Sequence, residues 1–165
     1  MLKQVQKQWF GHGILMLLAA LIGGVGLWMF LLGGFEIVPG YMLHFQLPGS
    51  VEGWHRIHAA PVMNGLMVIG VALVLPALDF SERAAKIMGW LIVADGWGNV
   101  IFYWFENFMP NRSLSFGPNQ FGPGSWWNVI GLGPAYVFGA IAIVVFAIIG
   151  WRGIHAISGK GTGEA

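Results

Sequence analysis

Apolar residues in this chain form four long blocks instead of alternating with polar ones. The blocks cover about residues 10–32, 57–78, 87–108 and 129–151. Each approaches the roughly 20 apolar residues that an α-helix needs to cross a bilayer. Because hydrocarbon offers the backbone no hydrogen-bond partner, segments of this length are expected to be helical, whereas barrel strands would be shorter and would alternate. The pattern predicts an all-α integral membrane protein, a bundle of four transmembrane helices.

The composition agrees with a membrane protein and excludes several classes of function. Of the 165 residues, 56% are hydrophobic and 9% are charged, whereas a soluble domain carries roughly a quarter of charged residues. The formal net charge of +1 creates no basic field, so no nucleic-acid partner is expected. The chain has no cysteine, which excludes disulfides, thiolate metal sites and haem attached covalently through cysteine.

The distribution of Lys and Arg predicts the orientation in the membrane. Six of them lie beside the termini or the short 79–86 connection, and two lie on the other side. The positive-inside rule therefore places both termini in the cytoplasm. We expect residues 1–157 to form one transmembrane domain and residues 158–165 a disordered tail. The connections 33–56 and 109–128 are long enough to suggest a functional role for that side.

Small residues four apart mark the first apolar block, as Ala19 with Gly23 and Ala20 with Gly24. In lipid, this spacing lets two helix backbones approach closely. We expect these residues to serve ordinary helix packing.

Polar side chains inside the predicted spans are the candidates for function, because each is costly in lipid unless it is paired or faces a cavity. Asp95, Asn99 and Tyr103 are spaced four apart and form one slanted stripe at about 100° per residue. The stripe either lines an internal pocket or fixes packing through hydrogen bonds to a neighbouring helix. The remaining polar residues of the spans are His12, His58, Asn64 and Tyr136.

His58 and Asn64 flank Pro61 in the second block. An ideal helix would separate them by about 120° and 9 Å, but a proline bends a helix and leaves that angle open. His58 lies near the outer end, where a neutral imidazole can offer a nitrogen to a metal. A lone histidine at such a place is more often interfacial, and His55 and His12 are rival nitrogens.

Several stretches between residues 11 and 139 match one known family in register. They are 11–16, 24–29, 33–41, 52–54, 58 with 61–65, 95–100, 102–103 and the loop 110–124. On these stretches the chain resembles the styrene oxide isomerases, small membrane enzymes of bacterial styrene degradation. Together the stretches are far more specific than any one of them.

The resemblance implies a four-helix subunit in the inner membrane of a bacterium and a homotrimer that binds haem b, with ferric iron, at its subunit interfaces. By matching position, His58 would be the axial ligand of the iron. Asn64 and Tyr103 would contact the epoxide, and Asp95 would belong to the same pocket. The implied substrate is an aryl epoxide, and the implied reaction converts styrene oxide to phenylacetaldehyde.

These residue types suit the chemistry of such a reaction. Opening an epoxide towards an aldehyde needs a Lewis acid on the oxygen, a benzylic cation and a 1,2-hydride shift, together called a Meinwald rearrangement. A haem with one histidine ligand leaves an open position for the oxygen. Tyr and Asn donors stabilise charge that grows on the oxygen, and a dry site keeps water from trapping the cation as a diol.

Two other functions use the same residues. A non-catalytic, haem-bearing electron-transfer subunit predicts reversible reduction by a donor. A small transporter of aromatic metabolites, with Asp95 as a relay group, predicts flux across vesicles without chemical change. The spacing of the residues does not choose among the three functions, and the resemblance favours the isomerase.

Overall fold

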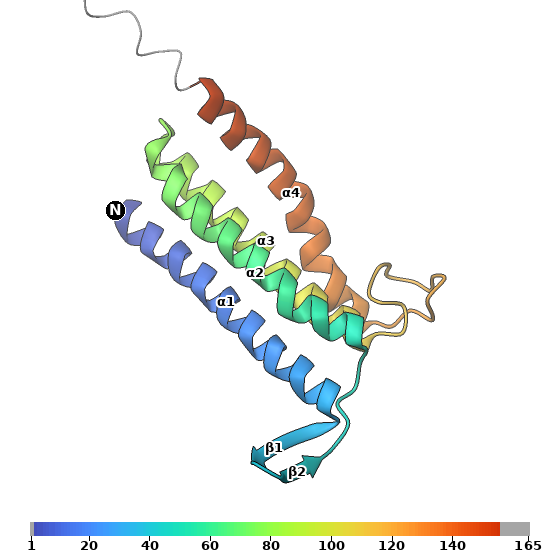
Figure 1. Ribbon diagram of the computed structural model, residues 1–165. Coiled ribbons are helices and arrows are strands. Elements are labelled where there is room, and N and C mark those ends of the chain that lie inside the picture. Colours follow the sequence, from blue (N-terminus) through green and yellow to red (C-terminus); the bar gives the residue numbers. More distant parts are fainter. Residues whose placement is uncertain (1, 156–165) are drawn as a thin grey trace, which may run out of the picture.

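The computed structural model describes residues 2–155, which form four long helices lying side by side (Figure 1). They are α1 Leu2–Leu32, α2 Val51–Val74, α3 Glu82–Phe108 and α4 Trp127–His155, and a short 3-10 helix, η1 Leu75–Ala77, follows α2. The helical architecture expected from the apolar blocks is confirmed. The tail predicted at residues 158–165 lies outside the described residues.

Three of the helices, α1, α2 and α4, have the length and hydropathy of membrane spans. The chain is therefore a membrane-embedded protein. Among the described helices, α3 is long enough, with 27 residues, but does not reach the same hydropathy. Its polar residues, Asp95 and Asn99 among them, lower the average, so the fourth predicted span rests on helix length and packing alone.

Helices α2 and α3 begin earlier than the apolar blocks predict, because serine caps start them in the polar flanks. The Ser50 hydroxyl accepts a hydrogen bond from the backbone N–H of Gly53 at 3.0 Å, and Ser81 caps α3 in the same way. Such caps satisfy backbone donors that a helix start leaves free. In the first turn of α3, Lys86 donates to Glu82 at 2.8 Å, which lowers the pKa of the Glu82 carboxyl.

The connection between α1 and α2 contains a β-hairpin, so the prediction of an all-α chain is wrong here. Strands β1 Gly34–Val38 and β2 Tyr41–His44 pair antiparallel. Gly40, in the turn between them, has a φ of +82°, which a glycine adopts without steric cost. Its backbone N–H donates to the Glu36 carboxylate at 2.8 Å. Strands this short leave little trace beside the much stronger pattern of the apolar blocks.

The helices pack in chain order rather than around one central axis. α1 packs on α2, α2 on α3 and α3 on α4, and α1 also contacts α3 (Figure 1). Met16, Val68 and Ile92 are almost completely buried at the centre of the core. Large apolar side chains remain exposed on the outer faces, for example Leu21 (63%) and Ile143 (73%). Contiguous apolar surface of this kind requires lipid or protein around it.

The Lys and Arg side chains separate to the two ends of the molecule as the sequence predicts. The start of α1, the α2–α3 connection and the end of α4 lie at one end, while the hairpin and the 109–126 connection lie at the other (Figure 1). The first end carries Lys3, Lys7, Arg83, Lys86 and Arg152, and the second carries Arg56 and Arg112. The cytoplasmic side of the first end stays a prediction.

The 109–126 connection is a compact loop built around a buried asparagine. Asn111 is completely buried, and its amide donates to the backbone carbonyls of Ser115 and Gly117 at 3.0 and 2.9 Å. Asn128, at the start of α4, donates to the Ser115 carbonyl from the other side at 3.1 Å. Buried amide hydrogen bonds of this kind hold a loop in one conformation, which fits a rigid cover at this end.

Candidate functional site

Glycines of α1 set the close packing of α1 on α2. A Cβ atom at Gly23 would lie 2.6 Å from the Cγ2 atom of Ile57, and one at Gly24 would lie 2.7 Å from the Nδ1 atom of His58. Both distances are too short for a side chain. The predicted packing role of these small residues is confirmed, and Gly24 in addition makes room for an imidazole.

His58 is held across this interface by the backbone of α1. Its Nδ1 atom lies 2.9 Å from the carbonyl oxygen of Ala20. A carbonyl oxygen only accepts, so Nδ1 carries the hydrogen and donates it. In the tautomer that this bond selects, the lone pair lies on Nε2, which makes no hydrogen bond among residues 2–155. Metal-ligating histidines are typically oriented by such a bond from the second nitrogen.

The two rival histidines are placed differently. Trp97 donates from Nε1 to the Nδ1 atom of His12 at 3.1 Å, so a lone pair of His12 is already used. His55 is exposed on the surface of α2. Within the described chain, no three His, Asp or Glu side chains gather closely enough to hold a metal ion. The donors available therefore suit a prosthetic group that needs one imidazole rather than a metal held by several side chains.

Asn64 lies on a different side of α2 from His58. The helix continues through Pro61 without a break. Val68 faces α3, since a Cβ atom at Gly96 would lie 3.2 Å from its Cγ2 atom. Asn64 precedes Val68 by four residues and lies within about 40° of it, so it also belongs to the α3 side. The structure thus separates the two residues, and His58 faces α1.

Asp95 and Asn99 form a hydrogen-bonded pair on α3. Asp95 is buried, with 5% of its surface exposed. The Asn99 amide donates from Nδ2 to the Asp95 carboxyl oxygen Oδ1 at 3.2 Å and to the Asp95 backbone carbonyl at 3.1 Å. From α4, a Cβ atom at Gly139 would lie 3.8 Å from the same Oδ1 atom. Asp95 therefore lies beside α4, and its described partner is in its own helix.

Tyr103 completes the polar stripe predicted on α3. It lies two turns beyond Asp95 and about 80° around the helix. Its ring is half-buried and meets the ring of Phe102 edge-on at 5.3 Å. Gly98 on the same helix faces α4, whereas Gly96 faces α2 and, at still shorter distance, α1. The stripe of Asp95, Asn99 and Tyr103 consequently occupies the side of α3 between α2 and α4.

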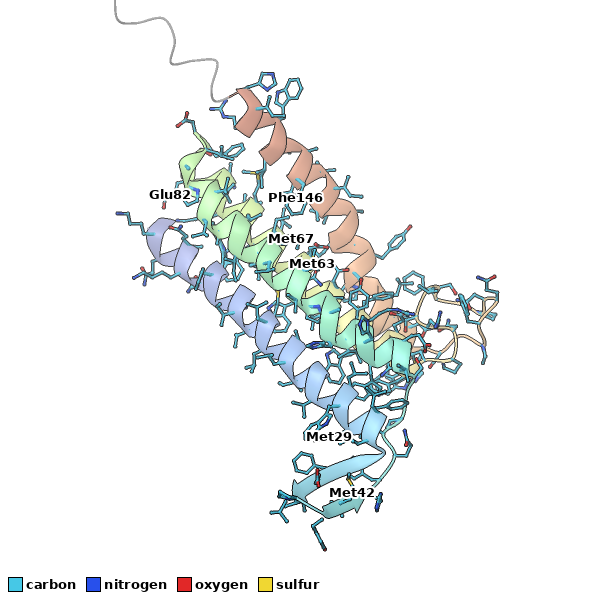
Figure 2. All side chains as sticks on the ribbon, viewed as in Figure 1. Met29, Met42, Met63, Met67, Glu82 and Phe146 are labelled. Carbon is cyan, nitrogen blue, oxygen red and sulfur yellow. The ribbon has the colours of Figure 1, made fainter. Side chains whose placement is uncertain are left out.

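Two of the larger surface hollows lie away from these residues. One of about 580 Å³ runs along α4 beside Ile143 and Ile148, and one of about 530 Å³ lies on α1 around Gly11 and His12. Neither is lined by His58 or by the polar stripe. On α2, Met63 is 70% exposed and is turned away from α1 (Figure 2). The candidate residues thus lie on two sides of one chain rather than around one cavity.

An ion pair near the polar stripe was missed by the sequence analysis. Arg56 of α2 pairs with Glu106 of α3, and Glu106 is buried, with 7% of its surface exposed. The pair lies one turn beyond Tyr103, at the outer end of the site. Opposite charges near matching ends of two antiparallel helices were the available signal, but Arg56 was counted only as a charge that sets orientation.

Comparisons with known proteins agree with the resemblance seen on the residues. Residues 5–154 match the family model described as styrene oxide isomerase. A curated protein of Pseudomonas fluorescens, named styrene-oxide isomerase, is 51% identical over 160 residues, which are 97% of this chain and 95% of that protein. Both matches extend over all four helices.

Proposed function

The chain belongs to the styrene oxide isomerase family and is an isomerase, and we propose that it converts aryl epoxides such as styrene oxide to aldehydes such as phenylacetaldehyde with haem b as its cofactor. The benzylic C–O bond of the epoxide breaks, a hydride moves from the neighbouring carbon to the benzylic carbon, and the C=O bond forms. Atoms and electrons balance within one molecule, so the reaction needs no oxidant and no water.

The orientation of His58 is the observation that carries this proposal. The hydrogen bond from Nδ1 to the Ala20 carbonyl, at 2.9 Å, and the space left by Gly24 hold the imidazole with Nε2 available. His58 would hold the iron of the haem through that nitrogen. When bound, ferric haem b supplies a Lewis acid for the epoxide oxygen.

The other residues of the site stabilise charge that develops on the substrate and help to exclude water. The Tyr103 hydroxyl and the Asn64 amide donate hydrogen bonds to the epoxide oxygen as negative charge develops on it. The carboxylate of Asp95, which is buried and has no cation beside it in the described chain, stabilises positive charge on the benzylic carbon. Lipid and apolar side chains exclude the water that would otherwise give a diol.

We further propose that the active site forms between subunits of a homotrimer in the bacterial inner membrane. His58 faces α1, whereas Asn64 and the polar stripe face away from it, so a flat cofactor on His58 of one copy meets the polar residues of a neighbouring copy. Exposed apolar faces on α1 and α4 are available for such contacts. With α3 as the fourth span, we also propose that both termini lie in the cytoplasm, which the Lys and Arg distribution supports.

Two histidines one turn apart allow a matched test of the cofactor. We expect His58→Ala, purified in detergent, to lose both the Soret absorption and aldehyde formation, while His55→Ala keeps both because His55 is exposed. Retention of haem and activity by His58→Ala would contradict the proposal and move ligation to His12 or His55.

The same preparation separates the isomerase from the alternatives. Aldehyde should form from styrene oxide alone, without an electron donor. A haem that a donor reduces reversibly, with no aldehyde formed, would indicate an electron-transfer subunit. Flux of unchanged epoxide into vesicles, again without aldehyde, would indicate a transporter.

A further inference from the structure

The carboxyl group of Asp95 has unusually little polar support for a buried acid. Residue Asp95 has 5% of its surface exposed, and neither ion pair of residues 2–155 includes it. On the α4 side its neighbour is Gly139, which brings no side chain. A buried carboxyl group without partners is expensive. Its conformation must therefore depend on the few donors that reach it.

Asn99 is the side chain that reaches it. The Nδ2 atom donates to the Oδ1 atom of Asp95 at 3.2 Å and to the Asp95 backbone carbonyl at 3.1 Å. The backbone carbonyl only accepts hydrogen bonds, so the NH₂ side of the amide must face it, and this bond fixes the orientation of the amide. Because one of the two bonds ends on the helix backbone, the amide is anchored and cannot follow the carboxyl group if that group rotates.

We infer that Asn99 is a positioning residue for Asp95, which holds the carboxyl group towards the site between α2 and α4. This inference rests on the proposed function, in which Asp95 stabilises the cation. Asn99 lies about 40° from both Asp95 and Tyr103 around α3, so it stands between the two functional groups while its nitrogen holds the acid. In the stripe, Asp95 and Tyr103 then act on the substrate, and Asn99 supports Asp95.

A double-mutant cycle tests whether Asn99 acts through Asp95. Asn99→Ala should lower kcat roughly tenfold, the size expected when one hydrogen bond to a charged group is lost, with KM and the Soret spectrum little changed. In an Asp95→Asn background the same change should lower kcat by less than about twofold, because no carboxylate remains to be held.

Asn107 provides the control amide on the same helix. It accepts a hydrogen bond from the Ser50 backbone at 2.9 Å and supports the start of α2. Asn107→Ala should therefore lower kcat by the same factor in the parent and in the Asp95→Asn background. If Asn99→Ala does not fold, Asn99→Ser enters the same cycle, since a serine hydroxyl donates one bond and cannot hold both acceptors.

The outcomes distinguish this inference from the proposed function. Equal losses from Asn99→Ala in both backgrounds, or an unchanged kcat, would overturn the positioning role. A full rate in Asp95→Asn with a loss in Asn99→Ala would also overturn it, because Asn99 would then act by itself while the haem-dependent isomerase stands. Failure of the unaltered protein to form aldehyde would instead overturn the proposed function.

Discussion

Two glycines that lie beside candidate residues, at different helix interfaces, leave different amounts of space. Between α1 and α2, Gly24 is in such close contact that a Cβ atom would lie 2.7 Å from the His58 ring. Between α3 and α4, a Cβ atom at Gly139 would lie 3.8 Å from the Asp95 carboxyl oxygen, which is an ordinary contact, although Gly131 at the same interface leaves no room for a Cβ atom. Gly24 makes room for the His58 ring, and Gly139 leaves space beside the Asp95 carboxyl group.

The polar groups at the two interfaces are also satisfied differently. His58 donates across the interface to the α1 backbone, so its orientation depends on how the two helices dock. Asp95 receives its hydrogen bond from within α3, so its orientation depends on one helix. In the proposed function, the bond to the α1 backbone orients His58 as an iron ligand, and the space beside Gly139 leaves Asp95 room to meet substrate.

The largest effect is expected from filling the tight interface. Gly24→Ala forces the His58 ring away from Ala20, and we expect haem content and activity to fall at least about tenfold. Gly70 of α2 is the control, because a Cβ atom there meets nothing within 4 Å, and Gly70→Ala should keep both. The measurement is the haem content per protein from the absorption spectrum. A parental haem content in Gly24→Ala would contradict the role of Gly24 in making room for the His58 ring.

Removing a donor from the polar stripe should affect turnover rather than haem. Tyr103→Phe is expected to lower kcat by roughly 100-fold, the cost of losing one donor to a developing oxyanion, with an unchanged Soret band. Tyr136, which is 68% exposed on α4, provides the matched Tyr136→Phe control. If both variants turn over at the parental rate, the hydroxyl of Tyr103 has no role in catalysis.

The ion pair of Arg56 and Glu106 joins α2 to α3 at the outer end, and it should contribute to stability. Arg56→Met leaves Glu106 buried without its partner, and we expect a loss of about 2 kcal/mol, less than for a fully buried pair because Arg56 is partly exposed. The added change Glu106→Gln should recover part of it. Thermal unfolding in detergent measures both, and equal losses in the single and double variants would argue against the pairing.

The smallest effect is expected from adding a methyl group beside Asp95. Gly139→Ala adds a methyl group at ordinary contact distance from Asp95, so kcat and haem content should change by less than about twofold. Steady-state kinetics of Gly139→Ala and Gly24→Ala, measured side by side, compare the two kcat values directly. A loss as large as that of Gly24→Ala would show that the space beside Asp95 does not admit a methyl group.

The parts of the fold that depend on local pattern were accessible from the sequence. The apolar blocks located four helices, and the spacing of Asp95, Asn99 and Tyr103 placed them on one side of α3. The hairpin at Gly34–Val38 and Tyr41–His44 was missed, because strands of five and four residues carry too few positions for an alternating pattern to stand out.

The relations between helices were not accessible in the same way. The sequence left three histidines open as ligands, and the choice of His58 came from the resemblance. The structure adds a physical reason, which is the bond from its ring to a backbone carbonyl on another helix. Every residue has a backbone carbonyl, so no residue type in α1 indicated which one accepts this bond. The pairing of Glu106 with Arg56 was missed because the sequence does not show which residues of two helices meet.

The sequence by itself determined that this chain lies in a membrane, where its helices run and which polar residues share a helix face, because hydropathy and helical period are properties of neighbouring residues. Only the tertiary structure decided that His58 faces α1 while Asn64 faces α3, and that Arg56 meets Glu106. These contacts join residues 38 and 50 positions apart or depend on how helices rotate against one another. Packing sets that rotation, and packing depends on all the helices at once.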